Sequence, residues 1–122
     1  MAFKDIFNKN FETRDDSPIE ALKSHYYRCR YNDALNKLKE LISNEKDVLI
    51  DENPNYHEYL FRNNSYDCVC TLTEINPTEI AIDFKIQTFD LFSFGKGKKI
   101  IAGFYKYFDS NLNFKGLGLY KG

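Results

Sequence analysis

Two runs of alternating apolar and polar residues, joined by Asn76-Pro77, constrain the fold of this chain more than any other feature. Successive side chains of a strand point to opposite faces of a sheet, so a period of two indicates a strand with one buried face. The apolar positions are Tyr66, Cys68, Cys70 and Leu72 in the first run and Ile80, Ile82, Phe84 and Ile86 in the second. The runs therefore predict a β-hairpin with one face in the core and one in solvent.

The rest of the chain predicts three more strands and two helices. Apolar residues at the 3.6-residue helical spacing predict a helix over residues 33–44, capped by the residue before it, and a second over 98–112. Alternation predicts strands at 25–31, 46–51 and 57–62. The order of elements is thus strand, helix, four-strand meander, helix.

This order predicts an α+β fold of type β-α-β(4)-α, with a five-stranded, curved antiparallel sheet. Two helices must each bury an apolar stripe, and an antiparallel sheet offers one apolar face, so we expect both helices on that face. The other face is expected to be open. With 122 residues the chain is of single-domain size. Residues 18–122 are expected to form the domain, and residues 1–17 an amphipathic segment and a linker, with Phe3, Ile6, Phe7 and Phe11 at helical spacing.

Composition excludes several classes of function. The net charge of −1 gives no broad basic surface, so nucleic acid is not an expected partner. No apolar run approaches membrane-spanning length, and the first residues do not resemble a secretion signal. Lys4 and Lys9 are too few basic residues for a stable membrane anchor. Three cysteines, an odd number, are typical of a reducing compartment, and we expect a cytoplasmic protein without cofactor.

A glycine- and lysine-rich turn is the sharpest chemical feature. It precedes the second predicted helix and consists of Gly95, Lys96, Gly97, Lys98 and Lys99. Glycines at a strand-to-helix turn let backbone N–H groups converge on an anion, and a helix N-terminus carries partial positive charge. The spacing is not that of a phosphate-binding P-loop. The turn is therefore interpreted as either an anion site or a flexible turn with solvated lysines.

The open sheet face is the most extensive candidate surface. Tyr26, Arg28 and Arg30 of the first predicted strand share this face with Asp83 and Lys85 of the hairpin. Aromatic and arginine side chains are favoured anchors of protein interfaces, so these five residues are the candidate interface. The alternative is a solvated face whose charges pair across strands.

Cysteine and histidine residues offer weaker candidates. Cys68 and Cys70, with Cys29, suggest a metal site completed by His25 or His57, but the Cys-x-Cys spacing on a strand favours small buried apolar residues instead. Each histidine neighbours a tyrosine, yet no nucleophile motif accompanies them. We therefore predict no metal site and assign no catalytic residue.

The element order over roughly residues 25–112 resembles the TATA-binding-protein-like topology and its enlarged helix-grip, START-like relatives. The whole chain also resembles a family of small uncharacterised cytosolic bacterial proteins. That likeness rests on residues 25–28, the hairpin at 69–83, the turn at 94–99 and Phe114-Lys115-Gly116. The resemblances imply a curved sheet and a cytosolic location, and no chemical activity.

Three hypotheses of function follow. The first is a non-enzymatic cytosolic binding or interaction module that forms homo-oligomers through the open sheet face, with the glycine-lysine turn as a second contact surface. The second is a helix-grip carrier of a small apolar ligand, suggested by the rings of Phe84, Phe104, Tyr105 and Phe108. The third is an enzyme that binds a phosphate ester, an anionic ligand, at the turn of residues 95–99.

Overall fold

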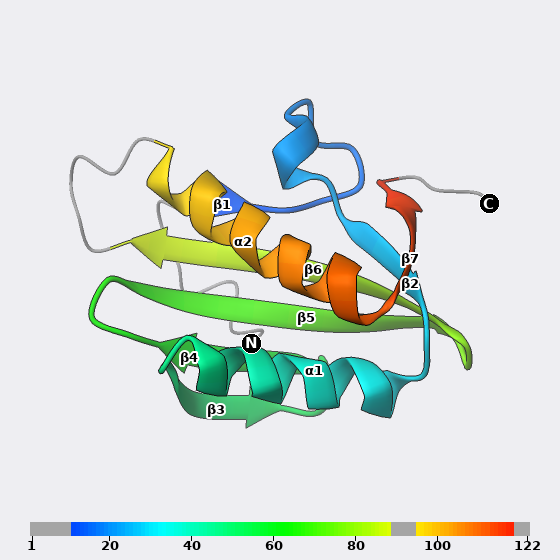
Figure 1. Ribbon diagram of the computed structural model, residues 1–122, viewed down its shortest axis with the longest axis horizontal. Helices are drawn as coiled ribbons and strands as arrows, with labels where there is room; N and C mark the ends of the chain where they lie inside the picture. The colour runs from blue at the N-terminus through cyan, green and yellow to red at the C-terminus, as the bar shows by residue number, and fades with distance from the viewer. Residues whose placement is uncertain (1–10, 89–94, 119–122) are drawn as a thin grey trace.

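The computed structural model describes residues 11–88 and 95–118 and has an α+β architecture (Figure 1). Its strands are β1 (Phe11–Glu12), β2 (His25–Arg28), β3 (Val48–Asn53), β4 (Glu58–Arg62), β5 (Tyr66–Asn76), β6 (Glu79–Thr88) and β7 (Asn113–Leu117). Its helices are the short 3-10 helix η2 (Glu20–Leu22), α1 (Tyr31–Asn44) and α2 (Lys96–Asn111). The antiparallel sheet has the order β3-β4-β5-β6-β2-β7, and β1 pairs with β6 beside β2.

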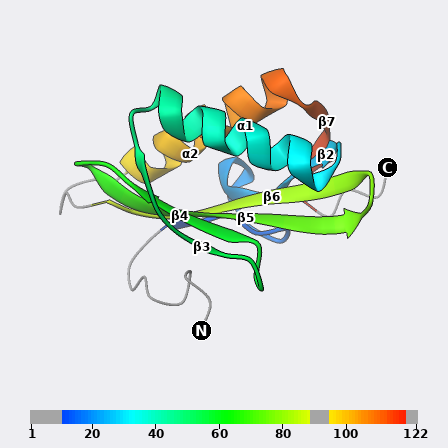
Figure 2. The same ribbon diagram turned by 90° about the horizontal axis from the view of Figure 1, so that it is seen from below.

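Both long helices lie on one side of the sheet, as the sequence predicts (Figure 2). α1 buries Ala34, Leu38, Leu41 and Ile42, and α2 buries Ile101, Phe104, Tyr105 and Phe108. These positions recur every three or four residues, so each helix presents one apolar stripe to the sheet. No helix in the ranges that the structure describes is long and apolar enough to cross a membrane.

The hairpin of β5 and β6 forms with the predicted residues facing the core and provides its floor. Cys70 lies opposite Phe84, and Leu72 lies opposite Ile82, all on the helix side. The ring of Phe84 packs 5.1 Å from the rings of both Phe104 and Tyr105 on α2. These rings pack together between α2 and the sheet, and a helix-grip carrier of an apolar ligand stays a prediction.

The prediction of five strands is wrong because two short strands extend the sheet. β1 completes the edge of β6 that β2 leaves unpaired, and β7 pairs with the outer edge of β2. An unpaired strand edge exposes N–H and C=O groups that a neighbouring segment satisfies. β1 has only two residues, and the two apolar residues of β7, Phe114 and Leu117, are three positions apart, so neither strand shows alternation. β1 therefore contains Phe11, which was predicted to belong to the helical segment, and Glu12, where the predicted linker begins. That linker also contributes the buried side chains of Thr13 and Ser17; residues 1–10 lie outside the described residues.

The first predicted strand is shorter than expected, because α1 begins earlier. β2 ends at Arg28, and Arg30 is the N-cap of α1 in place of Asn32. The Arg30 backbone N–H donates to the Asp33 carboxylate at 3.3 Å, which supports a helix start at this point. Arg30 therefore does not lie on the open face with Tyr26 and Arg28.

The face opposite the helices is not uniformly exposed. Glu58, Leu60 and Val69 lie on this face, yet their exposed fractions are 1%, 8% and 1%. Leu60 and Val69 lie opposite each other on β4 and β5 and form a small apolar cluster of their own. The prediction that this whole face is exposed to solvent is therefore wrong at β4 and the adjoining part of β5. A polar hollow lies elsewhere on the same face, around Asp83.

Candidate functional site

A polar cleft forms where two strands part along the edge of β6. β2 pairs with the first half of β6, with His25 opposite Ile82, and β1 pairs with the second half, with Glu12 opposite Lys85. Residues 13–24, between β1 and β2, leave the sheet and return to it as a loop, called the excursion below. The Arg14 N–H donates a hydrogen bond to the Leu22 carbonyl at 3.0 Å, which joins the two ends of this loop. Asp83 lies on β6 between the residues that pair with β2 and those that pair with β1.

Asp83 is held there by two hydroxyl groups from the excursion. Thr13 Oγ1 donates to Asp83 Oδ1 at 2.7 Å, and Ser24 Oγ donates to the same oxygen. Thr13 Oγ1 also accepts the Phe84 N–H at 2.9 Å, so this hydroxyl satisfies a backbone donor of β6. Thr13 and Ser24 are only 3% and 2% exposed. Buried polar groups with complete hydrogen bonding are rigid, so the wall of the cleft is preformed.

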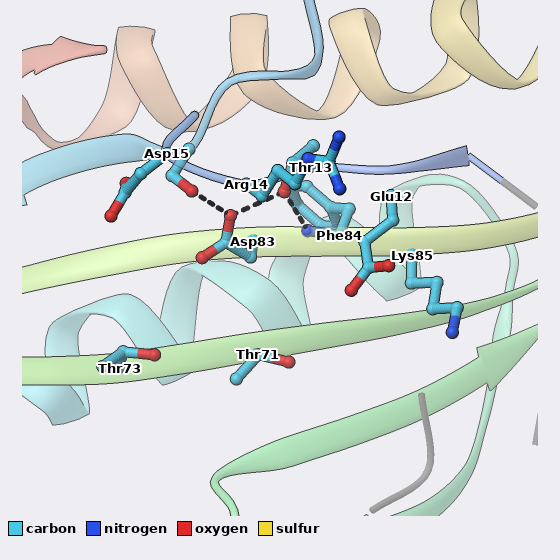
Figure 3. A pocket seen from close by; sticks show the side chains of 10 residues that line it. Glu12, Thr13, Arg14, Asp15, Thr71, Thr73, Asp83, Phe84 and Lys85 are labelled. Atoms are coloured by element: carbon cyan, nitrogen blue, oxygen red, sulfur yellow. Dashed lines mark hydrogen bonds between the residues drawn. The ribbon is translucent and has the colours of Figure 1, made fainter. Parts of the chain in front are cut away.

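The cleft has a volume of about 250 Å³ and opens on the face without helices (Figure 3). Its lining residues are Glu12, Thr13, Arg14, Asp15, Ser24, Thr71, Thr73, Asp83, Phe84 and Lys85. Three carboxylates and two cations therefore surround one hollow, together with four hydroxyl groups. This arrangement suits a small polar molecule that carries charge.

The structure brings together only part of the predicted interface. Asp83 and Lys85 line the cleft. Tyr26 lies at its border, where its hydroxyl donates to Asp15 Oδ1 at 2.8 Å, and burial with this hydrogen bond raises the pKa of Tyr26 above its usual value. Arg28 is exposed at the end of β2, and Arg30 lies at the start of α1. Self-association through these five residues stays a prediction.

The glycine-lysine turn becomes the first turn of α2. Gly95 is the N-cap with a φ of 77°, in the left-handed region that favours glycine. Gly97 is buried inside the helix, and the three lysines follow the helical path beside it. The first turn contains no acidic residue. None of these five residues lines the cleft, and an anion site at residues 95–99 stays a prediction; Phe94 lies outside the described residues.

A second group of polar side chains lies on the helix side of the sheet. His25 Nδ1 is 3.0 Å from Asp109 Oδ1, and the Tyr27 hydroxyl donates to the same carboxylate oxygen at 2.6 Å. The His25 ring stacks on the ring of Tyr105 with 3.5 Å between centroids and 4° between planes. This cluster was not predicted from the sequence, because His25 and Asp109 are 84 positions apart.

Local signals for this cluster exist in hindsight. His25 and Tyr27 are two residues apart and share one face of a strand, whereas Tyr105 and Asp109 are four apart and share one face of a helix. What the sequence lacks is the information that these two faces meet. That contact depends on how α2 crosses the sheet.

The cysteines behave as predicted for small buried side chains. Cys68 and Cys70 are 0% exposed on the helix side of β5, and burial raises the pKa of both thiols well above its usual value. Cys29 is half-buried, and burial with the nearby Asp33 charge raises its pKa to about 11. Among residues 11–88 and 95–118, no group of three or more histidine, cysteine, aspartate or glutamate side chains is placed to hold a metal ion.

Comparison of the chain with protein-family models, curated proteins and solved structures yields no match.

Proposed function

We propose that this protein is a binding module that holds a small, charged polar molecule in the cleft beside Asp83. The observation that carries the proposal is the hydroxyl pair of Thr13 and Ser24, which fixes the Asp83 carboxylate in a wall that exists before any ligand arrives. Binding sites are usually largely preformed, with a few polar groups that fix the orientation of the ligand.

Size and charge narrow the class of ligand. A volume of about 250 Å³ lies just below the range of about 300–1,000 Å³ typical of pockets for drug-sized molecules. The ligand is therefore small, of the size of an amino acid. Carboxylates outnumber cations in the lining, and both signs are present, so a zwitterion with an amine directed at the carboxylates fits best.

The test is an NMR titration of the ¹⁵N-labelled chain with a panel of free amino acids and simple amines. Binding in the cleft is expected to shift the amide signals of Thr71, Thr73 and Asp83. Lys85→Gln removes a cation from the lining and is expected to weaken carboxylate-bearing ligands more than simple amines. Arg28→Gln is the matched control, because Arg28 is exposed near the same face and lies outside the cleft.

Two results contradict this function. One is a panel in which no compound shifts the three cleft signals at millimolar concentration. The other is a set of shifts that Arg28→Gln weakens as much as Lys85→Gln does, since the binding surface then lies outside the cleft.

We also propose that the core has the TATA-binding-protein-like topology. The core follows the order β2, α1, β3, β4, β5, β6, α2, with β2 returning beside β6. This order supports the TATA-binding-protein-like topology for the core, with β1 and β7 as additions. A topology of this kind hosts many functions, so the assignment adds nothing to the choice of ligand.

A further inference from the structure

A second hollow lies on the opposite side of the sheet, between η2, β2 and α2. Its volume is about 330 Å³, and its lining residues are Ala21, His25, Ala102, Tyr105, Lys106, Asp109 and Ser110. It shares no residue with the cleft beside Asp83. A proposal for this second hollow can therefore be tested independently of ligand binding beside Asp83.

The hydrogen bonds at Asp109 fix which nitrogen of His25 carries a proton. The carboxylate oxygen of Asp109 accepts the Tyr27 hydroxyl, and it faces His25 Nδ1 at 3.0 Å. A carboxylate accepts hydrogen bonds and does not donate them, so Nδ1 carries the proton in the neutral ring. Nε2 then holds the lone pair. Among the described residues, the hydrogen-bond contacts of the ring are all at Nδ1 and no buried side-chain nitrogen lacks a partner, so Nε2 reaches solvent; 11% of the His25 side chain is exposed.

The surroundings of His25 keep the ring in one orientation. Tyr105 stacks on one face of the ring, and Phe114 lies 5.1 Å away between centroids. Burial lowers the pKa of His25 below its usual value, and the hydrogen bond and charge of Asp109 partly oppose this. The imidazole is therefore the neutral, basic form at neutral pH. The charged groups that line the hollow are Asp109 and Lys106, both from α2.

We infer that this hollow is a hydrolytic site for small carboxylic esters, in which His25 Nε2 acts as the general base on a water molecule. An imidazole whose Nδ1–H is held by a carboxylate is the arrangement that hydrolases use to remove a proton from a nucleophile. The exposed edge of His25, the fixed tautomer and the adjoining hollow occur together at this place. Asp109 acts through His25 and is a positioning residue.

The reaction balances with water as the only other reactant. His25 Nε2 takes a proton from water while the water oxygen forms a bond to the acyl carbon. The bond between the acyl carbon and the leaving oxygen then breaks, and His25 returns the proton to that oxygen. The products are a carboxylic acid and an alcohol, and His25 is regenerated.

The lining of the hollow indicates the kind of ester. Ala21, Ala102 and the Tyr105 ring offer apolar contacts for a short acyl or alcohol group. Lys106 is the cationic residue of the lining, and its ammonium group stabilises the negative charge that develops on the carbonyl oxygen. Small, neutral esters therefore fit this hollow better than the charged molecules proposed for the cleft beside Asp83.

The test is hydrolysis of p-nitrophenyl acetate by the full chain. The chain has two histidines, which gives a matched pair of variants. His25→Gln is expected to lower the rate by about 100-fold, within the range of general base catalysis, whereas His57→Gln is expected to leave it unchanged. His57 is not part of the hollow, and its ring lies beside Tyr31.

Asp109→Asn tests the positioning role through the pH profile. The Asp109 charge raises the pKa of His25, so its removal lowers that pKa further and makes Nε2 a weaker base. The expected result is a lower maximal rate together with a displacement of the rising limb to lower pH. A purely structural role of Asp109 predicts a lower rate with the limb in place.

Three results overturn the inference. The first is a rate for the native chain that does not exceed that of 4-methylimidazole at equal concentration. The second is a rate that falls equally in His25→Gln and His57→Gln. The third is accumulation of an acetylated His25 without slowing of the reaction in D₂O, which excludes water activation. The first and third are measured on the unmutated chain, so a folding defect of His25→Gln does not affect them.

Discussion

The two clefts of this protein are built around the same device, a carboxylate that accepts two hydrogen bonds through one oxygen. In the cleft beside Asp83 both donors are aliphatic hydroxyls, from Thr13 and Ser24. In the hollow on the helix side the partners of Asp109 are the Tyr27 hydroxyl and the His25 ring. The difference lies in the partner, because an imidazole titrates near neutral pH and an aliphatic hydroxyl does not.

This difference is the basis for proposing ligand binding at the Asp83 cleft and ester hydrolysis at the His25 hollow. Around Asp83 the hydrogen bonds fix the position of a carboxylate, and its two partners are hydroxyls that do not titrate near neutral pH. Around Asp109 they fix a tautomer and leave Nε2 of His25 as a base. The linings differ as well: the Asp83 cleft has five charged residues among its ten, whereas the His25 hollow has one carboxylate and one lysine beside two alanines and the Tyr105 ring.

The largest expected effect tests whether side chains on the two faces of β6 contribute unequally to the free energy of unfolding. Phe84 is 1% exposed and packs against Phe104 and Tyr105 on the helix side. Phe84→Ala is expected to lower the free energy of unfolding by about 3–5 kcal/mol because it leaves a cavity. Gln87→Ala, on the other face of the same strand, is expected to change it by less than about 0.5 kcal/mol. Urea denaturation measures both, and similar losses would break the comparison.

The Asp83 carboxylate gives the next largest effect. Asp83→Ala leaves the buried Thr13 and Ser24 hydroxyls without this acceptor and is expected to cost about 1–3 kcal/mol of stability. The same substitution is expected to cost less when Ser24 is already alanine, because one of the stranded donors is gone. Equal costs in the two backgrounds, measured by urea denaturation, would show that the Ser24 contact adds no stability.

His25 gives a smaller, pH-dependent effect. Its pKa in the folded chain is lowered by burial, so the unfolded chain binds the proton more tightly. The stability contribution is therefore fully present above the unfolded pKa and is lost as pH falls through the folded pKa. Denaturation midpoints between pH 7.5 and 4.5 are expected to fall less in His25→Gln than in the native chain. A parallel decline in both chains would contradict this sign.

The smallest effect is expected at the ion pair of Arg62 and Asp67 on the open side. The Arg62 side chain contacts Asp67 through two nitrogens, at 2.5 and 3.1 Å, and about half of it is exposed. Exposed ion pairs contribute little, so Arg62→Gln is expected to leave the thermal midpoint within experimental error at 0.15 M salt. A clear loss of stability would mean that exposed charges on the open side contribute more to the free energy of unfolding than exposed ion pairs usually do.

The local elements were predictable from the sequence to different degrees. The hairpin of β5 and β6 was predicted in its correct facing because eight alternating apolar residues specify one buried face. Strand β1 was not predicted, because two residues cannot show a period, and its formation depends on the free edge of β6. Arg30 was misplaced because the alternation continues past Arg28 while the backbone has already turned toward α1.

The sequence by itself determined which residues are apolar, with what period, and therefore the class of fold and the helix-covered face of β5 and β6. Only the tertiary structure decided the two candidate sites. Asp83 meets Thr13 across 70 positions, and His25 meets Asp109 across 84. The physical reason is that the period of apolar residues indicates which face of a single helix or strand is buried. A hydrogen bond between two elements depends on their separation and orientation, which the packing of the whole chain sets.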